Sequence, residues 1–111
     1  MCIKQEREEI TMRNIVLVCA AGMSTSLLVK KMREAATAEG YECEIHAYAL
    51  ANLVEKGPGA DIILLGPQVR YQLDAVKKQF PDKPVDTINM ADYGMMNGKN
   101  VIGAVKKALG D

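Results

Sequence analysis

Two short apolar runs constrain the fold of this chain more than any other feature. Residues 14–19 read Asn-Ile-Val-Leu-Val-Cys, and residues 62–65 read Ile-Ile-Leu-Leu. Runs of this length without polar alternation are typical of strands that are buried on both faces of a parallel sheet. Further strands are predicted at residues 43–47 and 85–88, where shorter apolar patterns lie between turn signals.

The segments between these strands have apolar side chains at helical spacing. This spacing predicts a helix that ends before Gly40, and others over residues 50–56, 68–80 and from 97 or 98 to 109. Strands that alternate with helices form βαβ units. We therefore expect an α/β domain over residues 13–111: a doubly wound, four-stranded parallel sheet flanked by helices on both faces. Residues 1–12 are charged and without periodicity, and are predicted to form a flexible N-terminal extension.

Composition excludes several classes of function. The 111 residues include 14 basic and 14 acidic side chains, and this balance argues against nucleic acid or an anionic membrane surface as the partner. No apolar run approaches the roughly 20 residues that cross a bilayer, so no membrane insertion is expected. The charged N-terminus lacks the apolar core of a signal peptide, which predicts a cytoplasmic protein with reduced cysteines.

Cys19 is the strongest candidate for chemistry. It ends the first predicted strand and precedes a tract of small and hydroxyl residues that leads into a helix. Free amides and the positive end of a helix can bind a phosphate there and favour the thiolate form of a cysteine. Gly22 allows close backbone approach, and Ser24, Thr25 and Ser26 offer hydroxyl donors and a helix N-cap. The alternative interpretation is a buried cysteine before an ordinary capped helix.

The tract differs from the signature of cysteine phosphatases. In that signature an arginine follows the nucleophilic cysteine after five residues, whereas this chain has Thr25 at that position. Without a guanidinium to neutralise the phosphoryl transition state, and with no obvious aspartate as general acid, fast hydrolysis is disfavoured. The residues favour a loop that carries a phosphoryl group on sulfur.

The residues of this loop also support a family resemblance. Residues 15–28 read Ile-Val-Leu-Val-Cys-Ala-Ala-Gly-Met-Ser-Thr-Ser-Leu-Leu, and residues 63–69 read Ile-Leu-Leu-Gly-Pro-Gln-Val and precede Tyr71. Together they resemble the IIB component of the phosphoenolpyruvate-dependent sugar phosphotransferase system (PTS), in its lactose/cellobiose class, which includes chitobiose-type carriers. The resemblance covers about residues 13–110, so the first dozen residues have no counterpart in the family pattern.

The resemblance implies a protein-N(π)-phosphohistidine–sugar phosphotransferase that needs no cofactor or metal. Cys19 would accept a phosphoryl group from a phosphohistidine of IIA. It would pass that group to a sugar held by the membrane permease IIC, such as cellobiose, chitobiose, lactose or another β-linked disaccharide. The phosphate-binding loop would comprise Ala20, Ala21, Gly22, Met23, Ser24, Thr25 and Ser26. A low-molecular-weight-type cysteine phosphatase and a phosphate-sensing module are the alternative hypotheses.

Other residues have weaker cases. A possible rim of the site follows the strand at residues 62–65, at Gly66, Pro67, Gln68 and Tyr71. Met90, Met95 and Met96 around Tyr93 suggest either an adaptable partner surface or core filling. Metal binding is disfavoured, because Cys2, Cys19 and Cys43 show no Cys-x-x-Cys spacing, and the lone His46 is predicted in mid-strand with a structural or solvent-facing role.

Overall fold

The computed structural model describes residues 13–19 and 23–110. The four strands run parallel to one another in the order β2-β1-β3-β4. In the register, Val18 of β1 is paired with Tyr48 of β2 on one side and with Leu65 of β3 on the other. The strands are β1 (Arg13–Cys19), β2 (Cys43–Ala49), β3 (Ile62–Leu65) and β4 (Val85–Thr87).

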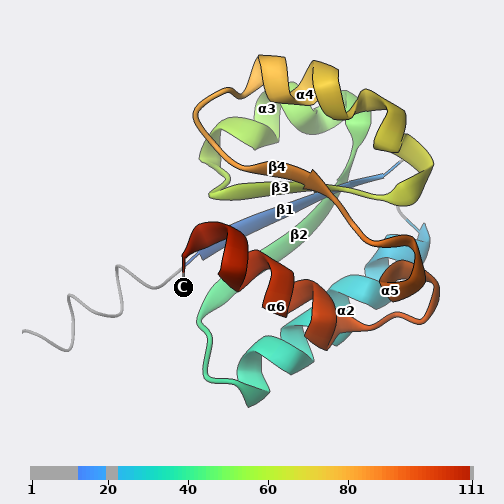
Figure 1. Ribbon diagram of the computed structural model, residues 1–111, viewed down its shortest axis with the longest axis vertical. Helices are drawn as coiled ribbons and strands as arrows, with labels where there is room; N and C mark the ends of the chain where they lie inside the picture. Colours follow the sequence, from blue (N-terminus) through green and yellow to red (C-terminus); the bar gives the residue numbers. More distant parts are fainter. Residues whose placement is uncertain (1–12, 20–22, 111) are drawn as a thin grey trace, which may run out of the picture.

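Helices cover both faces of this sheet (Figure 1). The face that carries Ile15 and Leu17 of β1 packs against α2 (Met23–Ala38), α5 (Met90–Gly94) and α6 (Gly98–Leu109). The face that carries Val16 and Val18 packs against α3 (Leu53–Lys56) and α4 (Leu73–Gln79). Within the described residues there are also three short 3-10 turns: η1 (Leu50–Asn52), η2 (Gly57–Gly59) and η3 (Pro67–Gln72). The expected doubly wound α/β architecture is confirmed.

The alternation of β1 explains the two separate cores. Side chains on a strand point to opposite faces in turn. Ile15 and Leu17 are fully buried on one face, and Val16 and Val18 are at most 1% exposed on the other. Burial on both faces is the reason that this segment reads as an uninterrupted apolar run.

Several elements differ from the sequence prediction, among them β2, the helix after β3 and α5. β2 extends to Ala49, two residues beyond the predicted strand. The helix predicted over residues 68–80 begins instead as η3 and becomes α-helical at Leu73, because the backbone at Val69 leaves helical geometry (φ −119°, ψ 19°). The short helix α5 was not predicted.

α6 approaches α2 closely at its first residue. Gly98 is buried, and a Cβ atom at this position would overlap the backbone carbonyl of Lys31 in α2. Near the C-terminal ends of the same helices, Lys106 Nζ lies 3.2 Å from Glu39 Oε1 and 5.4 Å from the centre of the Tyr41 ring. The absence of a side chain at Gly98 therefore sets the distance between the two helices that cover this face of the sheet.

We expect Gly98→Ala to destabilise the protein by about 1–3 kcal/mol, because the helix backbones must separate to admit the methyl group. Urea denaturation gives the free energy of unfolding. Gly103→Ala, in the same helix, is the matched control: a Cβ atom there would meet no neighbour within 4 Å, so the substitution should stabilise the helix by about 0.5–1 kcal/mol. Equal effects at the two positions would contradict the close approach.

Candidate functional site

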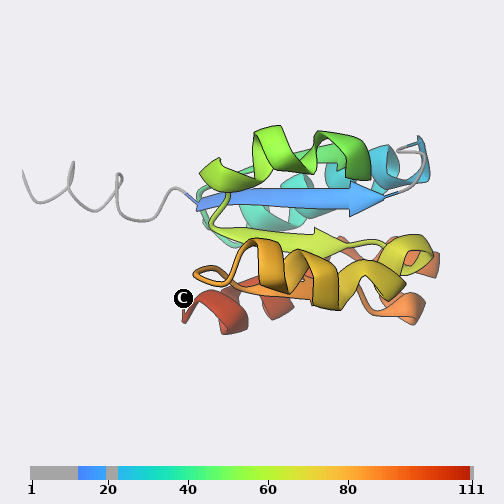
Figure 2. The same cartoon turned by 90° about the horizontal axis from the view of Figure 1, so that it is seen from above.

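The carboxyl edge of the sheet brings together the ends of the two central strands. Because the strands are parallel, Cys19 at the end of β1 and Leu65 at the end of β3 lie at the same edge (Figure 2). The chain leaves β1 toward α2 on one face and leaves β3 toward η3 and α4 on the other. Ligands of doubly wound sheets bind where neighbouring connections diverge in this way. The β1–β3 edge is therefore the candidate site.

Backbone hydrogen bonds fasten the turn after β3 to the end of β1. The Gly66 N–H donates to the carbonyl of Val18 at 2.7 Å, so Gly66 is bonded to the residue that precedes Cys19. The Val69 N–H donates in turn to the Gly66 carbonyl at 3.0 Å. The structure thus places the predicted rim residues Gly66 and Pro67 beside the end of β1.

Gln68 and Tyr71 of the predicted rim have different surroundings. The side chain of Gln68 donates a hydrogen bond from Nε2 to the hydroxyl of Tyr93 at 3.0 Å. Tyr71 is 75% exposed and points into solvent. Gln68 is therefore bonded to Tyr93 of α5, whereas the ring of Tyr71 is exposed to solvent.

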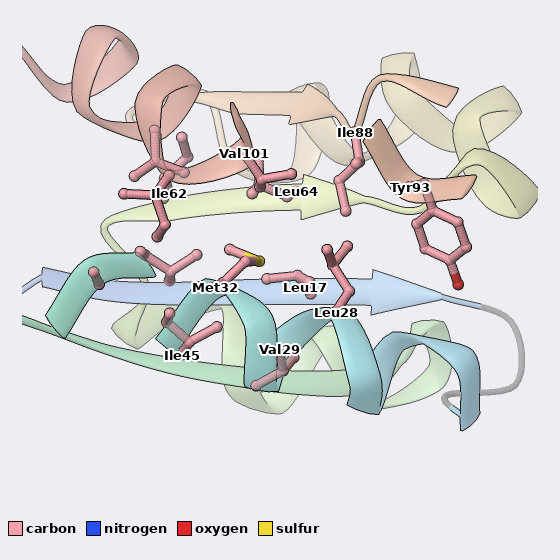
Figure 3. Close-up of a cluster of buried hydrophobic side chains, with 14 residues drawn as sticks. Leu17, Leu28, Val29, Met32, Ile45, Ile62, Leu64, Ile88, Tyr93 and Val101 are labelled. Carbon is pink, nitrogen blue, oxygen red and sulfur yellow. The ribbon is translucent and has the colours of Figure 1, made fainter. Parts of the chain in front are cut away.

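Sequence analysis named Tyr93 only as the centre of a group of methionines, whereas the structure places it at this edge. It lies on α5, is 9% exposed, and belongs to the same core as Leu17 and Leu28. In Figure 3 its hydroxyl lies beside the carboxyl end of β1. The signal that could have located α5 is Asn89, whose Oδ1 accepts hydrogen bonds from the N–H groups of Ala91 and Asp92 at the helix start.

The carboxylate of Asp92, next to Tyr93, is engaged elsewhere. Its Oδ1 accepts a hydrogen bond from Asn100 Nδ2 at 3.0 Å, which directs this oxygen toward α6. The contact links α5 to α6.

The predicted phosphate-binding loop is only partly described. Ala20, Ala21 and Gly22 lie outside the described residues, as do the side chains of Cys19, Met23, Ser24 and Thr25. The helix begins at Met23, so Ser24 to Ser26 lie within its first turn. The prediction that one of these hydroxyl residues is the N-cap is therefore wrong, because the N-cap precedes the first helical residue.

The remaining chemical candidates lie away from this edge. Cys43 starts β2, at the opposite edge of the sheet. His46 lies in the middle of β2, where its Nε2 is 3.4 Å from Glu44 Oε1 and its ring is 6.2 Å from that of Tyr48. The described part of the chain contains no group of three or more His, Cys, Asp or Glu residues that could hold a metal ion.

Comparison with known proteins decides the family. The family model described as "PTS system, Lactose/Cellobiose specific IIB subunit" matches residues 14–104. This chain belongs to that family. The match begins in β1 and ends in α6, so it includes every strand of the sheet and the whole candidate site.

Curated relatives of this IIB subunit carry different sugar names. The galactose-specific EIIB component of Lactococcus lactis subsp. cremoris (strain MG1363) and the cellobiose-specific EIIB component of Lactococcus lactis subsp. lactis (strain IL1403) are each 43% identical over 102 residues, or 86% of this chain and 94% of each relative. The oligo-beta-mannoside-specific EIIB component of Bacillus subtilis (strain 168) is 41% identical over 90 residues, which cover 79% of this chain and 87% of that protein.

Solved structures give the same fold. The cellobiose-specific IIB component of Borrelia burgdorferi is 37% identical, with a TM-score of 0.74 over 89% of this chain and 93% of that one. The lactose-specific IIB domain of Streptococcus pneumoniae has a TM-score of 0.78 over 87% of this chain and 97% of that one. At 16% identity, this second likeness shows the fold alone.

Family membership establishes the class of activity. As a IIB component, the protein is a phosphotransferase of a sugar-uptake system for sugars of the lactose/cellobiose class, and it works with IIA and IIC components. No helix in residues 13–19 and 23–110 is both long and apolar enough to cross a membrane.

We expect Cys43 to react slowly with iodoacetamide in the folded protein. Burial raises the pKa of the Cys43 thiol, so less of the reactive thiolate is present near neutral pH. Peptide mass spectrometry gives the labelling rate of this residue as a function of pH. The rate should be several-fold below that of the same residue in urea-unfolded protein, and should continue to rise above the pH at which the unfolded thiol levels off. Equal rates would contradict the burial.

Proposed function

We propose that Cys19 is the residue that carries the phosphoryl group. The observation that supports this most directly is the position of Cys19 at the end of β1, at the carboxyl edge and immediately before the connection to α2. In the first transfer the Cys19 thiolate attacks the phosphorus of a phosphohistidine on IIA. The S–P bond forms as the P–N bond breaks, and the imidazole nitrogen leaves with the electron pair.

The second transfer returns the sulfur to its starting state. A hydroxyl oxygen of the sugar, held by IIC, attacks the phosphorus of phosphocysteine, so that an O–P bond forms and the S–P bond breaks. The thiolate leaves with the electron pair, and the hydroxyl proton passes to a base of IIC or to water. Phosphoryl transfer of this kind depends on positioning and charge stabilisation.

The start of α2 supports both the thiolate and the phosphocysteine. α2 is 16 residues long, and its first turn contains no acidic residue. The positive end of its dipole is therefore not offset by a local carboxylate, and the N–H groups in the first turn of a helix are suited to an anion. We infer that residues 20–26 surround the phosphoryl oxygens, with backbone amides as the main donors and Ser24, Thr25 and Ser26 as hydroxyl donors.

A loop with these donors suits a carrier better than a hydrolase. Thr25 occupies the position of the phosphatase arginine. Neutral donors stabilise the phosphoryl group less than a guanidinium would, which fits near-balanced transfer between partners. The sugar is proposed to be cellobiose, chitobiose, lactose or another β-linked disaccharide, in agreement with the cellobiose name of one relative and the oligo-beta-mannoside name of another.

Exposed apolar side chains lie on the elements that follow the strands at this edge, and they suit docking by IIA and IIC in the cytoplasm. Four of them form what we call the docking rim: Leu27 (48% exposed), Tyr71 (75%), Met90 (59%) and Met95 (76%). They come from the start of α2, from η3 and from the two ends of α5. Methionine adapts its shape to different contacts. Because both partners must reach the same sulfur, we infer that they use this rim in turn.

Mass spectrometry after incubation with phosphoenolpyruvate, the general phosphotransfer proteins and IIA tests the role of Cys19. We expect one phosphoryl adduct on Cys19, absent in Cys19→Ser and discharged when IIC and sugar are added. Cys43→Ser is the matched control and should be phosphorylated normally, since Cys43 lies at the opposite edge. An adduct on another residue, or fast hydrolysis of a phosphate ester by the protein alone, would reject the carrier.

The docking rim is tested by adding charge to it. Met95→Lys should raise the concentration of IIA needed for half-maximal phosphorylation rate by about 5- to 30-fold, because a desolvated lysine replaces an apolar contact. Val54→Lys is the control: Val54 is 70% exposed, but it lies on α3, over the other face of the sheet from α5. Equal effects of the two variants would show that the rim has no special role.

A further inference from the structure

One basic side chain lies on the elements that follow the strands at the carboxyl edge. η1 follows β2, η3 follows β3 and α5 follows β4. Among the residues of these three elements, Arg70 of η3 is the only lysine or arginine, and α2 has none before Lys30. Lys99, in the first turn of α6, lines a groove with Glu34 of α2 instead. The positive side-chain charge of this edge is therefore concentrated in one guanidinium.

The backbone that carries Arg70 is anchored close to the end of β1. The Gly66 N–H, at the start of η3, donates to the Val18 carbonyl at 2.7 Å. Val69, which precedes Arg70, is 2% exposed and packs in the core under α4. In Figure 2, η3 is the short coil that lies just beyond the arrowhead of β3. Arg70 is exposed, so a fixed backbone presents its side chain to solvent at this edge.

The guanidinium of Arg70 is not committed to a contact within the fold. Among residues 13–19 and 23–110, none forms an ion pair or a hydrogen bond with this side chain, although Asp74 lies one helical turn farther along the chain. The neighbouring side chain, Tyr71, is 75% exposed. Arginine and tyrosine are among the residue types that contribute most to the binding energy of protein interfaces. This exposed pair is therefore suited to a partner.

The first transfer of the proposed function brings negative charge to the same edge. A phosphoryl group carries roughly two negative charges near neutral pH. Arginine suits such a group, because its planar guanidinium can form two parallel hydrogen bonds with phosphoryl oxygens. A positive charge at the surface also attracts an oppositely charged partner before contact and raises the rate of association.

We propose that Arg70 attracts the phosphoryl group of phosphorylated IIA and pairs with it at the surface as the two proteins dock. The inference rests on the proposed function, since it requires a phosphohistidine donor. Water and salt weaken an exposed ion pair, so Arg70 aids the encounter without holding the group as an arginine inside the loop would. Arg70 is thus a recognition residue for the phosphorylated partner.

The test measures phosphoryl transfer from phosphorylated IIA at several concentrations of IIA and of NaCl. Arg70→Gln removes the charge, and Arg70→Lys keeps it. Lys78→Gln is the matched control, because it removes one positive charge from an exposed residue of the same layer, in the last turn of α4. Calorimetric titration gives the affinity of each protein for unphosphorylated IIA.

At low salt, Arg70→Gln should raise the IIA concentration for half-maximal rate by about 3- to 10-fold and leave the maximal rate unchanged, because a surface charge acts mainly on association. The rate at limiting IIA should fall as NaCl rises, less steeply in Arg70→Gln than in wild type. Arg70→Lys should retain most of the wild-type behaviour, and Lys78→Gln should match wild type. Affinity for unphosphorylated IIA should be equal in wild type and Arg70→Gln, because that partner lacks the phosphoryl charge.

The outcomes separate this inference from the proposed function. Wild type that takes no phosphoryl group on Cys19 overturns the proposed function, and the inference with it. Wild type that is phosphorylated, with Arg70→Gln unchanged in half-maximal concentration and in salt dependence, overturns this inference alone. An equal loss of affinity for unphosphorylated IIA also overturns it, since Arg70 would then contact the protein surface of IIA. The same holds if Lys78→Gln behaves as Arg70→Gln does, because net charge alone would explain the effect.

Discussion

The parallel pairing of β1 with a strand on each side is the constraint on which the rest of the structure depends. Its backbone groups are bonded to β2 and β3, and its side chains from Ile15 to Val18 are buried on alternating faces. A strand in this position cannot shift by one residue, because every side chain would move to the wrong core. Cys19 is therefore held at one point of the carboxyl edge, and both helical layers are placed relative to it.

The chemistry of the site follows from where the strands end and from what surrounds that point. A helix of 16 residues without an acidic first turn begins shortly after Cys19, and Gly66 is bonded to the preceding residue. The donors inferred for the phosphoryl group are amides and hydroxyls. Such neutral donors stabilise the phosphoryl group only moderately, so a partner can remove it. A guanidinium would stabilise it more strongly and would favour its retention or its hydrolysis. An intermediate carrier must release the group as readily as it accepts it.

Exposed apolar side chains on elements at the same edge are suited to contact with the partner proteins. Leu27 and Met95 are exposed on one layer, and Tyr71 is exposed on the other. Single exposed apolar residues are common on protein surfaces, but their placement around one edge is suited to a shared docking surface. The hydrogen bond between Gln68 and Tyr93 joins η3 to α5, two of the elements that carry these exposed residues.

Local pattern was sufficient to predict the sheet, the doubly wound layers and the place of Cys19 at the end of β1, because burial on two faces leaves a continuous apolar run. It also pointed to Gly66 and Gln68, which follow β3. It could not predict that α2 begins at Met23 or that η3 precedes α4, since helix ends depend on local capping and backbone geometry. The position of Tyr93 could not be predicted from the local sequence pattern, for a different reason. Its partner is 25 residues away, and only the tertiary structure, by folding α5 over the end of β1, brings that hydroxyl to Gln68 and to the site.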